Sequence, residues 1–193
     1  MKRLLNIFII STIVTIMILG CGKDFSVPIR EPYVISDVDK VTSVAHHNEI
    51  RAAVGVYNKL VWDDKIAIDA QTYADKIALS GVWGHDPDND KSKLYDEDYG
   101  ENLYTCTAYD DNLLTKSSKI WAAEKPYYTY GPIGDASTCV RGQMCGHYTQ
   151  QVWANTSRMG CGVNIYKRGD KKGWYIIVCK YATPGNYYTE YPY

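Results

Sequence analysis

The stretch that decides the fold is a pair of strand-like runs near the C-terminus, GCGVNIY at residues 160–166 and WYIIVCKY at residues 174–181. The second run is rich in β-branched and aromatic residues, which favour a pleated and half-buried strand. Between them, RGDKKG at residues 168–173 carries the glycines and polar side chains of a short connection. The sequence therefore predicts an antiparallel hairpin formed by these two runs.

Helical patterns precede this hairpin. Apolar residues recur there with a period near 3.6, and aspartate or glycine marks the ends of the runs. An aspartate accepts hydrogen bonds from first-turn amides, and glycine tolerates the left-handed conformation that often ends a helix. The predicted helices run from Asp39 to Gly55, from the cap at Trp62–Asp64 to Gly81, from the cap at Asp110–Asn112 to before Pro126, and from Tyr148 to Ala154. Helices followed by antiparallel strands indicate an α+β class with helices packed on a sheet.

The N-terminus predicts export and a lipid anchor. Lys2 and Arg3 are cationic, and residues 4–20 carry no charged side chain. A basic start before a short apolar run is typical of a secretory signal. Residues 18–21 resemble the bacterial lipobox, in which cleavage precedes a cysteine that receives a diacylglycerol; a plain anchor helix is the alternative. We expect a signal peptide at residues 1–20, a tether at residues 21–38 anchored through Cys21, and one folded domain at residues 39–193.

The charge balance excludes a nucleic-acid partner. The chain has 21 Lys and Arg against 22 Asp and Glu, and loss of Lys2 and Arg3 with the signal leaves 19 against 22. A domain that binds nucleic acid would be clearly basic. The 18 tyrosines against two phenylalanines suit a wet binding surface, since tyrosine packs its ring and keeps its hydroxyl solvated. A compositional bias of the source is the alternative explanation.

The four histidines are the first candidates for chemistry, because the sequence has no His-Glu-x-x-His, Gly-x-Ser-x-Gly or Cys-x-x-Cys motif. His46 and His47 are adjacent on the first predicted helix and point about 100° apart, so we interpret them as packing or capping residues. His85 and His147 fall in or beside loops. Two imidazoles with nearby carboxylates can bind a divalent transition ion or transfer protons.

Six short motifs together resemble one family. GHYTQQVW at residues 146–153 resembles the first signature of the CAP superfamily, which comprises cysteine-rich secretory proteins, antigen five and plant pathogenesis-related group one. IVCKYATPGNY at residues 177–187 resembles its second signature. Shorter matches follow the family order at residues 47–51, 60–63, 99–103 and 121–124. The sequences of these motifs are most similar to those of the plant pathogenesis-related branch. The resemblance implies an α-β-α sandwich with three to four helices around a small antiparallel sheet.

The resemblance also implies a cleft lined by two histidines and two glutamates, which are His85, Glu101, Glu124 and His147 here. His85 and His147 would hold Zn²⁺ or another divalent cation, and the glutamates would orient them or a metal-bound water. Two protein ligands make a weak and open site, so occupancy should depend on added metal.

Three residues depart from the family pattern close to this cleft. Asp86 stands where a serine is usual, Gln151 where an apolar residue is usual, and Lys180 where a small polar residue, arginine or histidine is usual. None of them removes the four cleft residues, but each leaves the ligand preference open. The extra Asp86 carboxylate would either strengthen cation binding or lie in solvent.

We expect three different roles for the cysteines: disulfide bonds, a lipid anchor and a free thiol. The same resemblance implies one local disulfide between Cys139 and Cys145 and a second between Cys161 and Cys179. An exported domain meets an oxidising compartment, where such bonds form. With Cys21 lipidated, Cys106 is then expected to be a modifiable thiol.

The resemblance implies a binding module more than an enzyme. We expect a lipid-anchored, extracytoplasmic protein of the cell envelope, on the outer membrane or cell surface, that binds a sterol, fatty acid or other small ligand and interacts with a host protein. One alternative is a metal-dependent hydrolase or protease that uses the same cleft. The other is a structural module, in which the four cleft residues only join helices to the sheet, because buried charges need partners.

Overall fold

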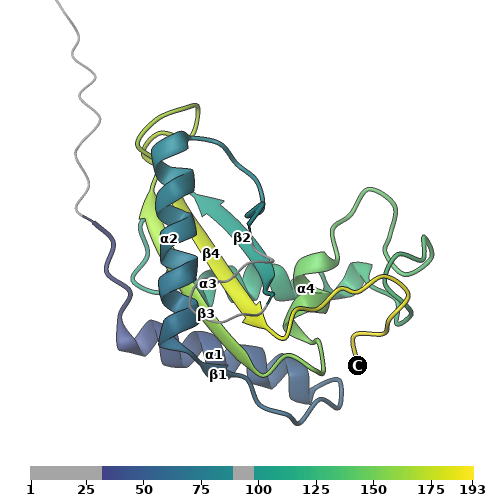
Figure 1. Cartoon of the computed structure of the whole chain (residues 1–193). Coiled ribbons are helices and arrows are strands. Elements are labelled where there is room, and N and C mark those ends of the chain that lie inside the picture. Colours follow the sequence, from purple (N-terminus) through teal and green to yellow (C-terminus); the bar gives the residue numbers. More distant parts are fainter. Residues whose placement is uncertain (1–31, 89–97) are drawn as a thin grey trace, which may run out of the picture.

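The computed structural model describes residues 32–88 and 98–193, which form a sheet covered by helices on both faces (Figure 1). The elements in chain order are α1 (Asp37–Ala52), β1 (Val61–Trp62), α2 (Asp64–Ser80), β2 (Gly100–Cys106), α3 (Leu113–Ala122), the 3₁₀ turn η1 (Lys125–Tyr127), α4 (Gly146–Gln151), β3 (Arg158–Ile165) and β4 (Tyr175–Ala182). The predicted α+β class and α-β-α layering are confirmed.

The sheet has four strands in the order β1-β3-β4-β2. The predicted hairpin is confirmed, because β3 and β4 pair antiparallel with Cys161 opposite Cys179. β2 adds a second antiparallel pair on the far side of β4, and the two-residue β1 pairs parallel with β3. The parallel β1 makes the sheet mixed, whereas the sequence predicted only an antiparallel one.

The two faces of the sheet bury different helices because side chains alternate along each strand. On one face, Ile176 and Val178 pack with Ala70, Tyr73 and Ile77 of α2. On the other face, the apolar core combines α3 with odd-numbered positions of β3 and β4; it includes Leu113, Leu114, Trp121, Val163, Ile177 and Tyr181. Each face of the sheet therefore has its own apolar core.

Glycine at two β3 positions allows α2 to approach the sheet. A Cβ at Gly160 would lie 2.2 Å from the backbone nitrogen of Ala67, and one at Gly162 would lie 2.3 Å from the backbone of Gln71. No side chain fits at such distances. The backbone of α2 therefore packs directly against β3, and glycine is required at these two positions, which lie on the same face of the strand.

The helix ends follow both local and long-range caps. Asp63 accepts hydrogen bonds from the amides of Lys65 and Ile66, and Gly81 ends α2 in the left-handed region at φ 75°, as predicted. The predicted cap of α3 at residues 110–112 is wrong in one respect. Asn112 is the N-cap residue but its side chain makes no capping bond.

The buried Asp39 of α1 caps α3 instead. Its two carboxylate oxygens accept hydrogen bonds from the amides of Leu114 and Thr115 at 2.8 and 2.9 Å. A residue 75 positions away supplies the cap, because α1 and α3 pack side by side on the same face of the sheet. α4 also differs from its prediction, since it begins at Gly146 rather than Tyr148.

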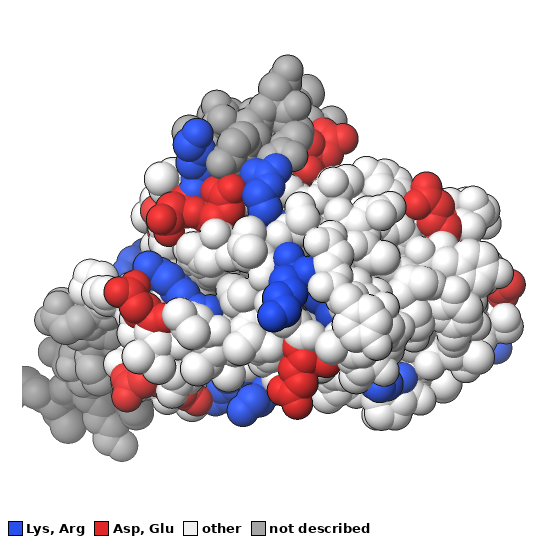
Figure 2. All heavy atoms as spheres, turned by 90° about the horizontal axis from the view of Figure 1, so that it is seen from below, with Lys and Arg blue, Asp and Glu red and all other residues white. Residues whose placement is uncertain are grey.

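The predicted signal peptide and Cys21 lie outside the described residues. Within residues 32–88 and 98–193, no helix combines the length and the apolar character that crossing a bilayer requires. The described side chains on the face in Figure 2 intersperse both charge signs without a continuous basic stripe.

Candidate functional site

His85 and Glu101 form the first pair of the cleft. His85 lies in the loop after α2, and its Nδ1 donates to Oε1 of Glu101 on β2 at 2.7 Å. The Asp86 amide donates to the same oxygen at 3.1 Å. The glutamate side chain is only 2% exposed, whereas the imidazole is 65% exposed. The hydrogen bond to Glu101 raises the pKa of His85, and partial burial opposes this shift.

His147 and Glu124 form the second pair. Nδ1 of His147 donates to Oε1 of Glu124 at 2.5 Å, and both side chains are mostly buried. Oε2 of Glu124 accepts from the backbone amides of His147 and Tyr148, so the same carboxylate also fixes the start of α4. The imidazole stacks on Trp121, with ring centroids 6.0 Å apart.

Strand β2 connects the two pairs. Asn102, the residue after Glu101, donates from its side-chain amide to the backbone oxygen of His147 at 3.1 Å. In the described part of the chain, however, no group of three or more His, Cys, Asp or Glu side chains is placed to hold a metal ion. The structure thus places the four predicted residues as two separate His–Glu pairs, with Asn102 of β2 bonded to the backbone of His147, rather than as one set of ligands.

The donor chemistry of these pairs fits a weak metal site. A carboxylate that accepts from Nδ1 fixes the histidine tautomer and leaves Nε2 as the metal-binding nitrogen, a common arrangement at metal centres. Neither Nε2 has a partner among the described residues. Oε2 of Glu101 is also buried and without a partner there. His85 and His147 would supply two nitrogens, and a stable site would need water or another ligand.

Two of the departures from the family pattern bind each other. Nζ of Lys180 lies 2.8 Å from Oδ2 of Asp86, and the two side chains are 5% and 11% exposed. The ammonium also lies 5.6 Å from the ring centroids of Tyr73 and of Tyr99. Sequence reasoning treated the two as separate changes, although their opposite charges were a signal that they pair.

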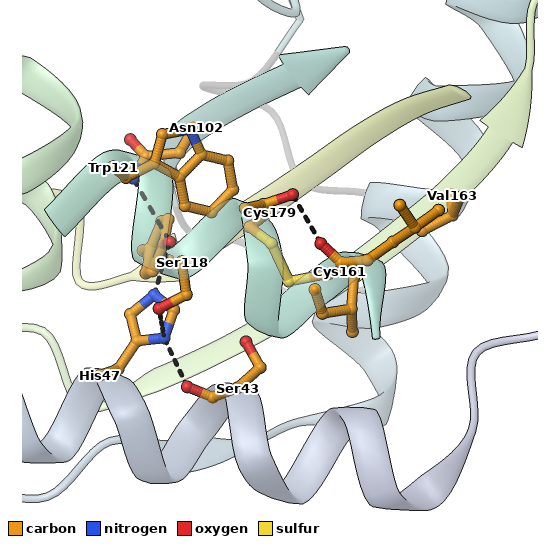
Figure 3. Close-up of a disulfide and its surroundings, with 12 residues drawn as sticks. Ser43, His47, Asn102, Ser118, Trp121, Cys161, Val163 and Cys179 are labelled. Atoms are coloured by element: carbon orange, nitrogen blue, oxygen red, sulfur yellow. Dashed lines mark hydrogen bonds between the residues drawn. A yellow bond between two sulfur atoms is a disulfide. The ribbon is translucent and has the colours of Figure 1, made fainter. Parts of the chain in front are cut away.

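The third departure, Gln151, points away from the cleft. Its buried amide donates to the backbone oxygen of Ser118 at 3.1 Å and lies 3.2 Å from Nε2 of His47. It joins a buried polar network between α1, α3 and α4, part of which Figure 3 shows around His47, Ser43 and Ser118. The sequence placed the Gln151 amide near the cleft, whereas in the structure this amide hydrogen-bonds within the buried core.

His47 is fully buried in this network. Its Nδ1 donates to the backbone oxygen of Ser43 at 2.8 Å, and its Nε2 accepts from the hydroxyl of Tyr181 at 3.0 Å. Burial lowers the pKa of His47 to about 4, so the ring is neutral near pH 7. The adjacent His46 also contacts this network, because Nδ1 of each imidazole lies within hydrogen-bond distance of the hydroxyl of Ser118.

Arg51 is a buried residue whose role sequence reasoning missed. Its guanidinium donates only to backbone oxygens, at distances of 2.7 to 3.4 Å; they belong to Asn58, Gln151, Trp153, Ala154 and Thr156. Burial lowers its pKa to about 10. The side chain ties the end of α1 to the segment that follows α4. The five acceptors lie up to 105 positions away, so no local pattern could have indicated this role.

The two disulfides join the residue pairs that the family resemblance implies. Cys139 bonds Cys145 just before α4, and Cys161 bonds Cys179 across the hairpin (Figure 3). Among the described cysteines, Cys106 is outside both bonds, and its Sγ contacts the backbone oxygen of Ala108.

The layering and the paired cleft define a CAP-type α-β-α domain. Residues 44–181 match the family described as CAP, the cysteine-rich secretory protein family. The chain is 40% identical over 147 residues to pathogenesis-related protein 1A of Nicotiana tabacum, covering 76% of each, and 38% identical over 146 residues to pathogenesis-related protein PR-1 of Medicago truncatula, covering 76% and 74%. The chain therefore belongs to the CAP family, and its relatives include plant pathogenesis-related proteins.

Solved structures agree with this fold. Na-ASP-1 superposes with a TM-score of 0.65 at 26% identity, over 81% of this chain and 41% of that chain. NaASP2, whose structure was determined with Zn²⁺, also has a TM-score of 0.65, at 21% identity over 90% of each chain. At these identities the likeness concerns the fold of the domain.

Proposed function

We propose that this CAP domain is an extracytoplasmic binding module whose cleft holds a divalent transition cation, with Zn²⁺ as the first candidate, between His85 and His147. The observation that carries the proposal is the arrangement of the two His–Glu pairs. Each glutamate holds Nδ1 and so directs the remaining nitrogen of its histidine to a ligand. When bound, the metal would supply a Lewis-acidic centre for an anionic or carbonyl group of a small ligand.

The chain's own residues then have distinct roles in the module. The buried Glu101 orients an exposed imidazole, and Glu124 orients a stacked one while it fixes α4. No Ser or Cys nucleophile lies in either described pair, and we propose binding rather than catalysis. The small ligand, a sterol or fatty acid by family resemblance, is a further part of the same proposal, as is a host protein partner.

A structural role is the second candidate, and Glu124 favours it. Both carboxylate oxygens of this residue already accept hydrogen bonds from α4, so its removal would free the helix start whether or not a ligand binds. Under this alternative, Glu124→Gln would lower stability while zinc affinity stayed unchanged.

The proposed location is the cell envelope, with the domain anchored through a lipid on Cys21. Membership of a secretory family and two disulfides support an extracytoplasmic domain, since such bonds persist in oxidising compartments. Cys21→Ala should abolish labelling of the chain by a clickable fatty acid, and label that persists would contradict the anchor.

Calorimetric titration of the full chain with Zn²⁺ in detergent micelles tests the metal site. We expect saturable binding that weakens about tenfold or more in both His85→Ala and His147→Ala. His46→Ala is the matched control, because His46 contacts Ser118 and neither cleft glutamate. Absence of saturable binding, or equal affinity in all four proteins, would refute the metal site.

A further inference from the structure

The buried ion pair between Lys180 and Asp86 lies at the His85 end of the cleft. Lys180 pairs directly opposite Glu101 in the β2–β4 register, so both side chains emerge on the same face of the sheet. Asp86 is adjacent to His85, and its amide donates to the glutamate oxygen that also accepts from His85. The ammonium is thus connected to the candidate metal ligand through three consecutive contacts: Lys180 to Asp86, Asp86 to Glu101, and Glu101 to His85.

The surroundings of this ammonium are aromatic and acidic. Tyr73 and Tyr99 place their rings near Nζ, and cation–π attraction strengthens in such a buried setting. Burial, and then the negative charges of Glu101 and Asp86, raise the pKa of Tyr73. The hydroxyl of Tyr73 donates to the backbone oxygen of Gly84, one residue before His85.

We propose that Lys180 weakens divalent-metal binding at His85 by supplying a fixed positive charge to this end of the cleft. This inference rests on the proposed metal site and deepens it. Like charges repel, and solvent screens the repulsion less when the fixed charge is buried, so the buried ammonium disfavours a nearby divalent cation even though the His85 ring faces solvent. The ion pair also engages the carboxylate of Asp86, the acidic residue next to His85 in the sequence.

A purely structural role for the ion pair predicts the opposite result. If Lys180 only pins the His85 loop to β4, its removal loosens the imidazole and metal affinity falls. If its charge competes with the metal, removal leaves Asp86 and Glu101 without a competing cation and metal affinity rises. The sign of the change therefore distinguishes the two roles.

The experiment is Zn²⁺ titration of the full chain in detergent micelles, by calorimetry for the wild type and Lys180 variants. Lys180→Met keeps most of the aliphatic stem and removes the charge, and we expect it to bind zinc at least about tenfold more tightly than the wild type. Lys180→Arg keeps the charge and should remain within about threefold of the wild type. If Lys180→Met fails to fold, Lys180→Gln replaces it with the same expected direction.

A double-mutant cycle with Asp86 completes the test. Asp86→Ser leaves the ammonium without its carboxylate and should weaken zinc binding, whereas Asp86→Ser with Lys180→Met restores the charge balance and should return close to wild-type affinity. Unchanged or weaker binding in Lys180→Met, while the wild type still requires His85 and His147, overturns this inference alone. Failure of both proteins to bind zinc overturns it together with the proposed metal site.

Discussion

The histidines of α1 and of the cleft occupy opposite environments. His47 is fully buried, both of its ring nitrogens have partners, and burial lowers its pKa to about 4. His85 is mostly exposed, has one nitrogen held by Glu101, and has a raised pKa because of that hydrogen bond. A histidine with both nitrogens satisfied in the core serves packing, whereas one with a single oriented nitrogen remains available to a ligand.

Arg51 near His47 and Lys180 near His85 also differ in how their charges are satisfied. Arg51 satisfies its guanidinium entirely with backbone oxygens and lies in the α1 network. Lys180 has a carboxylate partner in Asp86 and pairs in the β2–β4 register with Glu101, whose Oε2 has no partner among the described residues. The two cations therefore differ, because backbone oxygens satisfy Arg51 whereas Lys180 depends on a carboxylate. Unpartnered buried atoms occur in both regions, since Ser43 Oγ and Gln151 Oε1 of the α1 network also lack a partner among the described residues. The predictions below test whether the difference between the two regions separates stability from binding.

Replacement of Arg51 should produce the largest change. Arg51→Met removes the guanidinium's hydrogen bonds to five backbone oxygens, three of which belong to the buried residues Gln151, Trp153 and Thr156, and this should lower the free energy of unfolding by about 3–5 kcal/mol. Urea unfolding followed by circular dichroism measures the change. Arg51→Lys is the control, since it keeps the charge but lacks the forked geometry, and it should lose less. A loss below about 1 kcal/mol in Arg51→Met would show that the network does not depend on it.

This prediction also indicates what sequence reasoning could and could not reach. The hairpin and α2 were predictable because their signals are local: alternating apolar residues, the Asp63 cap and the left-handed Gly81. The Asp39 cap of α3 and the acceptors of Arg51 were not, because each depends on contacts between segments far apart in the sequence. Local capping and periodicity carry no information about such contacts.

The candidate site divides in the same way. Motifs named the two histidines and two glutamates, but their arrangement as separate pairs depends on how β2 passes α4. The ion pair between Asp86 and Lys180 spans 94 positions and follows from the strand register. The motifs therefore named four residues that the structure shows as two hydrogen-bonded pairs, whereas the charges around them could be known only from the fold.

The buried His47 should make stability fall in acid. Its pKa is about 4 in the folded state against about 6.5 when unfolded, so below pH 6.5 the unfolded chain binds the extra proton. Stability should therefore decrease as the pH falls from about 6.5 to 4, by up to roughly 3 kcal/mol from this group. His47→Gln should be less stable at pH 7 and lose this part of the pH dependence. Parallel urea curves for both proteins from pH 7 to 4 measure it, and equal pH slopes would contradict the assignment.

The two disulfides should differ modestly in their contributions. Cys161 and Cys179 are 18 positions apart, and Cys139 and Cys145 are 6 apart. Loop-closure entropy therefore predicts losses of about 3 and about 2 kcal/mol when each pair is replaced by alanine. Thermal unfolding of the two double variants measures the difference. Only loss of the bridge before α4 should also weaken zinc binding, because α4 carries His147.

The smallest expected change in stability is at His85. This change tests most directly the comparison between the cleft histidine and the buried His47. The imidazole is mostly exposed, and the Asp86 amide still donates to the same oxygen of Glu101 when the imidazole is removed. His85→Ala should therefore change the free energy of unfolding by less than about 1 kcal/mol. At the same time it should weaken zinc binding about tenfold, whereas His47→Gln should lower stability and leave zinc affinity unchanged. If His85→Ala instead destabilises the domain as much as His47→Gln does, the cleft histidine is a structural residue like its α1 counterpart. Equal zinc affinity in that variant would then assign the paired glutamates to holding the loop and α4 in place.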